Sequence, residues 1–286
     1  MYQLSDVQTI KSILKRHGFS FSKGLGQNFL IDPAVCPGIA KESGIHAGAG
    51  VIEIGAGIGV LTAELAKRAK KVVSFELDSR LSPILRETLA DFDNVTILHK
   101  DIMDADIDAV IAGHFAGMPV YVCANLPYYI TSPIIMKFLE GRAAVHSLTL
   151  MVQSEAAARL CAAVGSREAG AVSVAVSYFA EAERLFFVPR TSFLPSPSVD
   201  SEVIRLTVRE QPPVSLQNEE FFFQLVKAAF AQRRKTAQNG ISAGTGIEKP
   251  RIAAAFAAMG LDESIRAERL TLSQLAELSN VLYEPK

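Results

Sequence analysis

The stretch VIEIGAGIGVLT, residues 51–62, places three glycines between an apolar, strand-like run and a helical pattern. Gly55, Gly57 and Gly59 let the backbone turn tightly and approach a ligand that a Cβ atom would exclude. A dinucleotide-binding loop carries its third glycine one residue later, where this chain has Val60. The stretch therefore predicts a strand, a loop and a helix that open an α/β sheet, and it leaves cofactor binding and tight packing as two explanations of the loop.

Strand-like runs alternate with helical stretches on the C-terminal side of this loop. The strand-like runs are VIEI, KVVSFEL, VTIL, MPVYVC and SLTLMV, and helices are expected at 60–69, 79–90 and 132–140. This alternation is typical of βαβ units, in which a parallel sheet carries helices on both faces. Ser132 and Pro133 suit the N-cap and first turn of a helix, so the last of these helices is expected to begin there. The predicted fold class is α/β.

The N-terminal residues 5–17 fit an amphipathic helix. Ser5 suits its N-cap, and Gly18 suits its end. This helix lies before the α/β pattern, so we expect it to be an extension of the main domain.

The C-terminal part of the chain changes in character after a linker. The strand-like runs RLFFV and EVIRLTV follow a helical stretch near 153–162, and the linker REQPPVS comes next. Helical patterns without a comparable strand occupy 218–231, 248–259 and 271–282. We therefore expect a large α/β domain at 1–210 and a small all-helical domain at 214–286.

Composition limits the classes of partner. The 286 residues carry a formal net charge of −1, with 49% hydrophobic and 21% charged residues, so any contact with nucleic acid must be local. Basic residues gather in the first thirty positions and in QRRKT at 232–236. Cys36, Cys123 and Cys161 form neither a metal spacing nor an even disulfide set, which suits a reducing cytoplasm. We expect no metal, and no signal peptide or membrane span is evident.

Two acidic residues follow neighbouring strands of the predicted sheet. Glu76 ends the second strand in SFELD, where a carboxylate can hold both hydroxyls of a ribose. Asp101 follows the third strand in LHKDIM, where it can accept a hydrogen bond from an adenine amino group. Together with the glycine loop they describe an adenosine across the sheet edge. If that adenosine carries no phosphate, S-adenosylmethionine is the natural cofactor.

The fourth strand ends in ANLPYYITSP, residues 124–133, which a proline-punctuated loop would also explain. Asn125 Oδ1 and the Leu126 carbonyl could both accept from an adenine amine, drawing its lone pair out of the ring. Pro127 biases Leu126 toward an extended conformation, and Tyr128 could stack on a base drawn out of a helix. No general base is required, because the alkylated nitrogen becomes acidic. Tyr129 is expected to pack in the core.

Several blocks of the sequence resemble the ribosomal RNA adenine dimethyltransferases that modify the small subunit. The blocks are KGLGQNFLID, EIGAGIGVLT, FELDSRL, ANLPYYITSPII, MVQSEAAARL, FLPSPSVDSEVIRL and FAQRRKT, in the order of that family. The resemblance covers residues 23 to about 240. It implies a Rossmann-like, S-adenosylmethionine-dependent fold with a helical C-terminal domain that binds RNA. It also implies N6,N6-dimethylation of two adjacent adenines near the 3′ end of 16S rRNA in an immature 30S subunit. For a partner particle of this size we expect a monomer, and the cysteine content places it in the cytoplasm.

The resemblance also assigns residues to the site. The residues expected around the cofactor are Asn28, Leu30, Gly55, Gly57, Glu76, Asp101 and Asn125. The residues expected at the target base are Asn125, Leu126, Pro127 and Tyr128. Phe193 either packs on that base or belongs to the core. The residues expected to grip the RNA are Lys23, Arg233, Arg234 and Lys235.

Three alternatives remain at this stage. The large-subunit adenine methylases that confer macrolide resistance share the cofactor blocks, but they more often have isoleucine at the position of Leu126 and are strongly basic, whereas this chain has a pI near 6.5. A binding protein is the second alternative: either an assembly factor that checks an immature small subunit, or a transcription-factor relative that kept the fold and lost catalysis. The intact Asn-Leu-Pro-Tyr stretch and cofactor loop argue against lost catalysis. A nicotinamide oxidoreductase would require glycine where Val60 stands.

Overall fold

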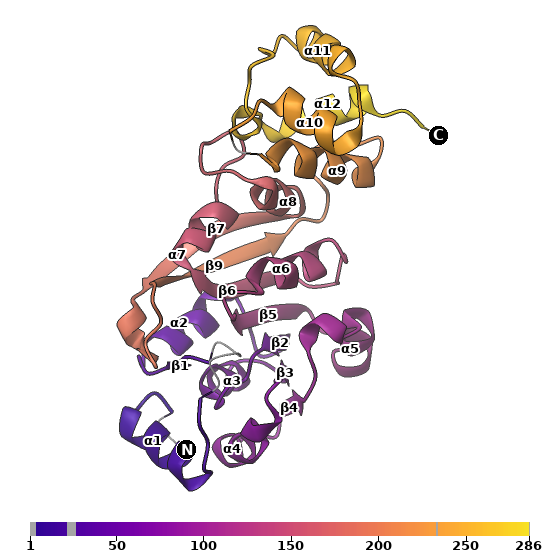
Figure 1. Cartoon of the computed structure of the whole chain (residues 1–286). Helices are drawn as coiled ribbons and strands as arrows, with labels where there is room; N and C mark the ends of the chain where they lie inside the picture. The colour runs from indigo at the N-terminus through magenta and orange to yellow at the C-terminus, as the bar shows by residue number, and fades with distance from the viewer. Residues whose placement is uncertain (1–3, 22–26, 233, 286) are drawn as a thin grey trace. The chain divides into compact units, whose positions relative to one another are not determined.

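The computed structural model describes residues 4–21, 27–232 and 234–285 (Figure 1). Its contacts divide the chain into two units, one formed by Met1–Ala157 and Glu183–Val208, the other by Ala158–Ala182 and Arg209–Lys286. The second unit thus includes a segment, before residue 183, that the sequence pattern placed with the first. The domain boundary predicted at residues 210–214 stays a prediction.

A seven-stranded sheet forms the core of the first unit, which confirms the predicted α/β class. Its order is β4-β3-β2-β5-β6-β9-β7, with bounds Val95–Leu98, Lys71–Phe75, Gly50–Ile54, Val120–Asn125, Ser147–Gln153, Ser201–Val208 and Ala180–Val188. The first five strands in this order pair in parallel, and β9 is antiparallel to β6. The order reverses between β2 and β5, because the chain first builds outward to β4 and then returns. An open α/β sheet binds its ligands in the crevice at such a point.

Helices cover both faces of the sheet. The helices of the first unit outside its N-terminus are α2 (Val35–Glu42), α3 (Val60–Ala66), α4 (Ser82–Thr88), α5 (Ile107–His114) and α6 (Thr131–Leu139), and α7 (Ser154–Leu160) begins in this unit. Figure 1 shows α2 and α3 on one side of the strands and α5 and α6 on the other. Ile39 and Leu65, both fully buried, pack with Val51 and Val72 of the strands in one apolar cluster. The central parallel strands β2, β3 and β5 are buried on both faces, whereas the edge strand β4 is partly buried.

Two predicted helix starts are wrong in detail. The N-terminal helix α1 (Val7–Arg16) has Asp6 as its N-cap, and the Asp6 carboxylate accepts from the Thr9 amide at 2.7 Å, so Ser5 lies outside the helix. Helix α6 begins at Thr131 after Ile130, without a side-chain cap, so Ser132 and Pro133 lie inside its first turn. A proline is tolerated there because the first amides of a helix have no intrahelical acceptor. The stretch predicted as one helix at 79–90 is a 3-10 turn followed by α4.

A two-stranded sheet that the sequence pattern did not predict lies beside the main one. Strand β1 (Phe29–Leu30) pairs antiparallel with β8 (Phe193–Leu194), and Leu30 faces Phe193 in the register. These strands join segments more than 160 residues apart in the sequence. The pairing holds the segment that begins at Gln27 next to the main sheet.

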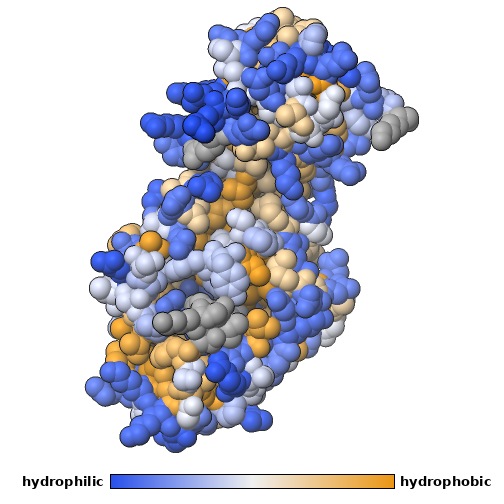
Figure 2. All heavy atoms as spheres, in the orientation of Figure 1, coloured by the Kyte–Doolittle hydropathy of each residue, from blue (hydrophilic) through white to orange (hydrophobic). Residues whose placement is uncertain are grey.

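Apart from the first residues of β7, the regular elements of the second unit in the described residues are helices. Its helices are α8 (Ala171–Phe179), α9 (Glu219–Phe230), α10 (Ala237–Thr245), α11 (Lys249–Ala258) and α12 (Leu272–Leu282), so the three helices predicted beyond the linker are confirmed. Figure 2 shows mainly hydrophilic residues on the face of the C-terminal helices turned toward the viewer. In the described parts of the chain, no helix combines the length and the apolar character needed to cross a bilayer.

Candidate active site

A cavity of about 360 Å³ lies in the first unit, at the carboxyl ends of β2, β3 and β5. The predicted site residues that line it are Asn28, Leu30, Gly55, Gly57, Glu76, Asp101, Asn125, Leu126, Pro127, Tyr128 and Phe193. Arg234 and Lys235 are exposed in the second unit, and Lys23 and Arg233 lie outside the described residues. The structure thus brings the predicted cofactor and base residues together in one place.

The three glycines of the loop differ in what they do. Gly55 and Gly57 line the cavity with φ angles of 83° and 58°, a region that favours glycine. Gly59, with a φ of 90°, does not line the cavity, and a Cβ atom there would lie 3.0 Å from Leu89 Cδ2 and 3.1 Å from Thr88 Oγ1. Of the two explanations of the loop, ligand approach therefore fits Gly55 and Gly57, and close packing fits Gly59.

Glu76 holds a fixed carboxylate in the cavity wall. It is 7% exposed, its Oε2 accepts from the Gly57 amide at 2.8 Å, and its Oε1 accepts from the Asp78 amide at 2.8 Å. Burial raises the pKa of Glu76, and these two amides act in the opposite direction by stabilising the charged form. The group is therefore oriented before any ligand arrives, and it connects the glycine loop to the end of β3.

Asp101 caps the 3-10 turn that follows β4. Its Oδ1 accepts from the Met103 amide at 2.8 Å, and the residue is half-buried between Lys100 and Ile102 in the cavity wall. A carboxylate has acceptor sites beyond the one that this turn uses. Asp101 can therefore accept from an adenine amine at this edge of the cavity.

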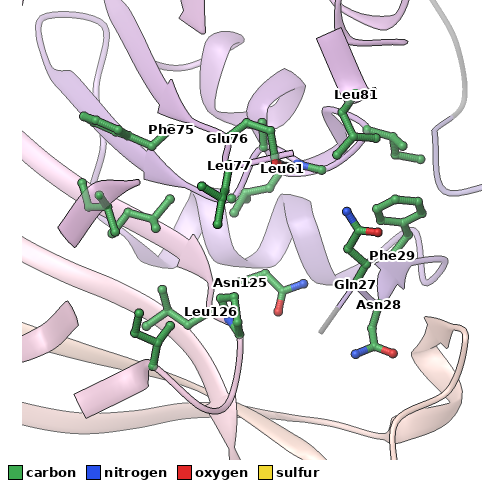
Figure 3. Close-up of a pocket in the computed structure, with 18 of the residues that line it drawn as sticks. Gln27, Asn28, Phe29, Leu61, Phe75, Glu76, Leu77, Leu81, Asn125 and Leu126 are labelled. Carbon is green, nitrogen blue, oxygen red and sulfur yellow. Dashed lines mark hydrogen bonds between the residues drawn. The ribbon is translucent and has the colours of Figure 1, made fainter. Parts of the chain in front are cut away.

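Asn125 and Leu126 continue β5 into the cavity. Asn125 is the last residue of the strand, opposite Met151 of β6, and the Leu126 amide donates to the Met151 carbonyl at 3.2 Å. Figure 3 shows the Asn125 amide extending into the cavity, with Gln27 and Asn28 on the opposite side. Among the described residues, no group forms a hydrogen bond with the Asn125 side chain. This amide is thus available to a substrate.

The two tyrosines of the loop have opposite environments. The Tyr128 hydroxyl forms a 2.8 Å hydrogen bond with Ser201 Oγ, and burial raises the pKa of Tyr128. Tyr129 is 64% exposed at the rim of the cavity, so the expectation that it packs in the core is wrong. The loop turns back at this point, since the Ile130 amide donates to the Pro127 carbonyl at 3.2 Å, and the turn directs consecutive side chains apart.

Two further residues complete the wall. Phe193 is 3% exposed, packs in the apolar cluster beneath the sheet and also lines the cavity, so it meets the geometric requirement of both alternatives. Gln27, which the sequence pattern did not single out, lines the cavity and donates through Nε2 to Asp78 Oδ2 at 2.8 Å. The only sequence signal for Gln27 is its position beside Asn28.

A buried carboxyl group lies on β2 just before the glycine loop. Glu53 is fully buried, and its Oε2 accepts from Thr62 Oγ1 of α3 at 2.7 Å, so a hydrogen bond joins the two ends of the loop. Ser74, its register partner on β3, lies beside Glu53, and its hydroxyl, like that of Thr62, favours the charged carboxylate and so lowers the pKa. Burial raises the pKa of Glu53 from 4.5 to about 7.

The raised pKa of Glu53 predicts a pH-dependent stability. The folded state holds this proton more tightly than the unfolded chain does. Deprotonation of Glu53 should therefore lower the free energy of unfolding by about 3 kcal/mol as the pH rises from 4.5 to about 7. Above about pH 7 this group should cause no further loss of stability. Glu53→Gln removes the titration, so this variant should exceed the parent protein in stability at pH 8 and match it more closely at pH 5. Urea unfolding at both pH values measures the difference.

The matched control for this variant is Glu64→Gln. Glu64 lies on α3 and forms ion pairs with Lys67 and Arg68 near the surface. That variant should keep the pH dependence of the parent protein, and parallel pH profiles for Glu53→Gln and the parent protein would disprove the assignment.

The residues around the cavity fit an adenosine-bearing cofactor. Gly55 and Gly57 leave space that a side chain would fill, and the Glu76 carboxyl group is placed to accept from two hydroxyl donors. Asn28 lies across the cavity from Asn125 (Figure 3). The donor and acceptor set is thus consistent with S-adenosylmethionine.

Comparisons with known proteins agree with this geometry. The family model described as Ribosomal RNA adenine dimethylase matches residues 18–284. The chain is 52% identical over 276 residues to the ribosomal RNA small subunit methyltransferase A of Geobacillus thermodenitrificans (strain NG80-2), covering 95% of this chain and 94% of that protein. It is 50% identical over 278 residues to the protein of the same name from Bacillus pumilus (strain SAFR-032), covering 96% and 95%.

Two solved structures share the fold over most of the chain. The 23S rRNA methyltransferase ErmE is 27% identical with a TM-score of 0.69, covering 89% of this chain and 99% of that one. A dimethyladenosine transferase from Plasmodium falciparum is 24% identical with a TM-score of 0.71, covering 87% and 95%. The Rossmann-like arrangement predicted from the sequence is therefore confirmed.

Proposed function

The chain belongs to the ribosomal RNA adenine dimethylase family, and we propose that it transfers methyl groups from S-adenosylmethionine to the N6 amino groups of two adjacent adenines near the 3′ end of 16S rRNA. Each adenine receives two methyl groups. The observation that carries the proposal is that the Asn125 amide extends into the same cavity as Glu76 and the glycine loop. The group proposed to accept from the target amine and the group proposed to accept from the ribose hydroxyls thus line the same cavity.

The cofactor site in this proposal is formed at three strand ends. Glu76 holds the ribose hydroxyls with a carboxylate that two backbone amides already orient. Asp101 accepts from the adenine amino group of the cofactor, and the backbone at Gly55 lies close to the rest of it. Leu30 of β1 and Asn28 just before this strand also line the cavity. Bound there, S-adenosylmethionine supplies an electrophilic methyl group.

The target base would be held by Asn125 at the end of β5 and by the residues that follow it. An adenine amine is a poor nucleophile because its lone pair is delocalised into the ring. Asn125 Oδ1 and the Leu126 carbonyl accept from its two N–H groups, so the nitrogen becomes pyramidal and the positive charge that develops on it is stabilised. Tyr128 packs against the base, held through its hydroxyl by Ser201. No histidine lines the cavity among the described residues, and the methylated nitrogen can lose its proton to water.

The substrate in this proposal is an immature 30S subunit. Relatives that share about half of their residues with this chain are named for the small subunit, whereas the 23S enzyme ErmE shares 27%. Arg234 and Lys235, exposed in the second unit, are proposed to contact the RNA backbone together with Lys23 and Arg233. We further propose that the protein acts in the cytoplasm as a monomer, since one copy contains a complete set of site residues.

Labelled S-adenosylmethionine tests this function directly. The purified protein is incubated with 30S or 50S particles from a strain that lacks the modification, and the label is mapped on the RNA. The expected result is label on two adjacent adenines near the 3′ end of 16S rRNA, as N6,N6-dimethyladenosine. Label on 23S rRNA would favour the macrolide-resistance activity, and bound cofactor without label on either particle would favour a binding protein.

A further inference from the structure

Exposed apolar side chains gather at the mouth of the cavity. The described residues include six large hydrophobic side chains that are exposed, and two of these, Tyr129 and Leu77, line the cavity. They are 64% and 54% exposed, while Leu126 beside them is 1% exposed. An exposed aromatic ring at the rim of a binding site is a place where a ligand can remove apolar surface from water.

The backbone fixes where Tyr129 stands relative to Tyr128. The turn from Pro127 to Ile130 is closed by an amide-to-carbonyl bond of 3.2 Å, and Thr131 Oγ1 donates to the Pro127 carbonyl at 3.4 Å at the start of α6. Tyr128 is held on the inner side of this turn by its bond to Ser201. Tyr129 is thus the next residue outward on a loop that is anchored at both ends.

We infer that Tyr129 stacks on the nucleobase adjacent to the target adenine while Tyr128 faces the target itself. The inference rests on the proposed function. When one adenine is drawn into the cavity, its neighbour loses the stacking partner that it had in the RNA. An aromatic ring one residue outward from Tyr128 can replace that partner, and stacking on a tyrosine tolerates any base because every base has a π-face. The two adjacent adenines can then exchange places between the tyrosines.

Substitutions at Tyr129 separate the ring from the hydroxyl group. Tyr129→Phe should methylate 30S particles like the parent protein. Tyr129→Ala and Tyr129→Leu should raise the KM for 30S particles roughly 10-fold, the scale of one lost base–aromatic stack, with kcat changed less than about 2-fold. The dissociation constant of S-adenosylmethionine and the melting temperature should not change. Phe187→Ala is the matched control, because Phe187 is 58% exposed but does not line the cavity.

A second substrate identifies what the ring contacts. The second substrate is a 30S particle reconstituted with an abasic nucleotide in place of one target adenine. The parent protein should bind this particle more weakly than the unmodified one, whereas Tyr129→Ala should bind both particles with the same affinity. The inference would be overturned if the affinities of the two proteins differed by the same factor on this particle as on the unmodified one. It would also be overturned if Tyr129→Phe were as impaired as Tyr129→Ala. If the parent protein labels 30S particles and Tyr129→Ala does so equally well, only the inference fails. If the parent protein labels no 30S particle, the proposed function fails with it.

Discussion

Asn125→Ala is expected to lower kcat for methylation of 30S particles by roughly 1,000-fold, the range found when one preorganised partner of a developing charge is removed. The side chain acts mainly in the transition state, when the amine nitrogen becomes pyramidal. Cofactor affinity should therefore fall only modestly, by less than about 5-fold. Single-turnover methylation measures the first quantity, and calorimetric titration with S-adenosylmethionine measures the second.

The structure also predicts that this variant folds normally. Asn125 is half-buried, and its side chain forms no hydrogen bond within the described residues, so its removal should leave the melting temperature within about 2 °C. Tyr128→Phe is the comparison within the same loop, because it keeps the ring and removes only the hydrogen bond to Ser201. Its activity should fall by about 10-fold at most. Near-normal turnover by Asn125→Ala would show that the amine is activated by another group.

Residues at the ends of parallel strands were predictable because the sheet brings those ends to one edge. The glycine loop, Glu76, Asp101 and Asn125 lie after successive strand-like runs in the sequence, and all four line one cavity in the structure. Their positions along the chain and the topology of the fold determine this convergence. The roles assigned to them individually remain predictions.

Features that depend on distant partners were not predictable in the same way. Gln27 forms a hydrogen bond with Asp78, 51 residues away, and the sequence around either residue does not predict this pair. Helix α10 was missed because its sequence, AQNGISAGT, contains two glycines that disfavour an isolated helix. These glycines are explained by packing, since a Cβ atom on Gly244 would lie 2.4 Å from the Cβ atom of Ala228 on α9.

Local competition explains the remaining differences. Ser5 and Asp6 are both good N-cap residues. With Asp6 as the N-cap, its carboxylate accepts two hydrogen bonds, from the Thr9 amide at 2.7 Å and from the Thr9 hydroxyl at 2.8 Å. Tyr129 was assigned to the core because aromatic residues usually bury their rings. Its exposure follows from the turn that precedes α6, which leaves the ring at the rim of the cavity.

Glu76→Ala is expected to act on the other half of the site and to weaken cofactor binding by about 100-fold. Two hydrogen bonds from ribose hydroxyls to a carboxylate, each contributing about 1.5 kcal/mol, account for this loss. At saturating cofactor the turnover should recover to within about 10-fold of the parent protein, because Asn125 and the Leu126 carbonyl remain in place. Asn125→Ala should show the opposite pattern, a large loss of kcat with little loss of cofactor affinity. The two variants together test whether Glu76 binds the cofactor and Asn125 activates the amine.

The effect of Glu76→Ala must be separated from a change in the loop. Glu76 also accepts from the Gly57 and Asp78 amides, so its loss leaves two donors without their acceptor. Glu76→Gln keeps one acceptor oxygen and the same shape, and it should lose an intermediate amount of affinity with a melting temperature closer to that of the parent protein. Asp104→Ala removes an exposed charge near Asp101 outside the cavity and should bind the cofactor normally. If Glu76→Ala bound S-adenosylmethionine within about 3-fold of the parent protein, the ribose would have to be held elsewhere, and the charge of this buried carboxylate would serve the loop alone.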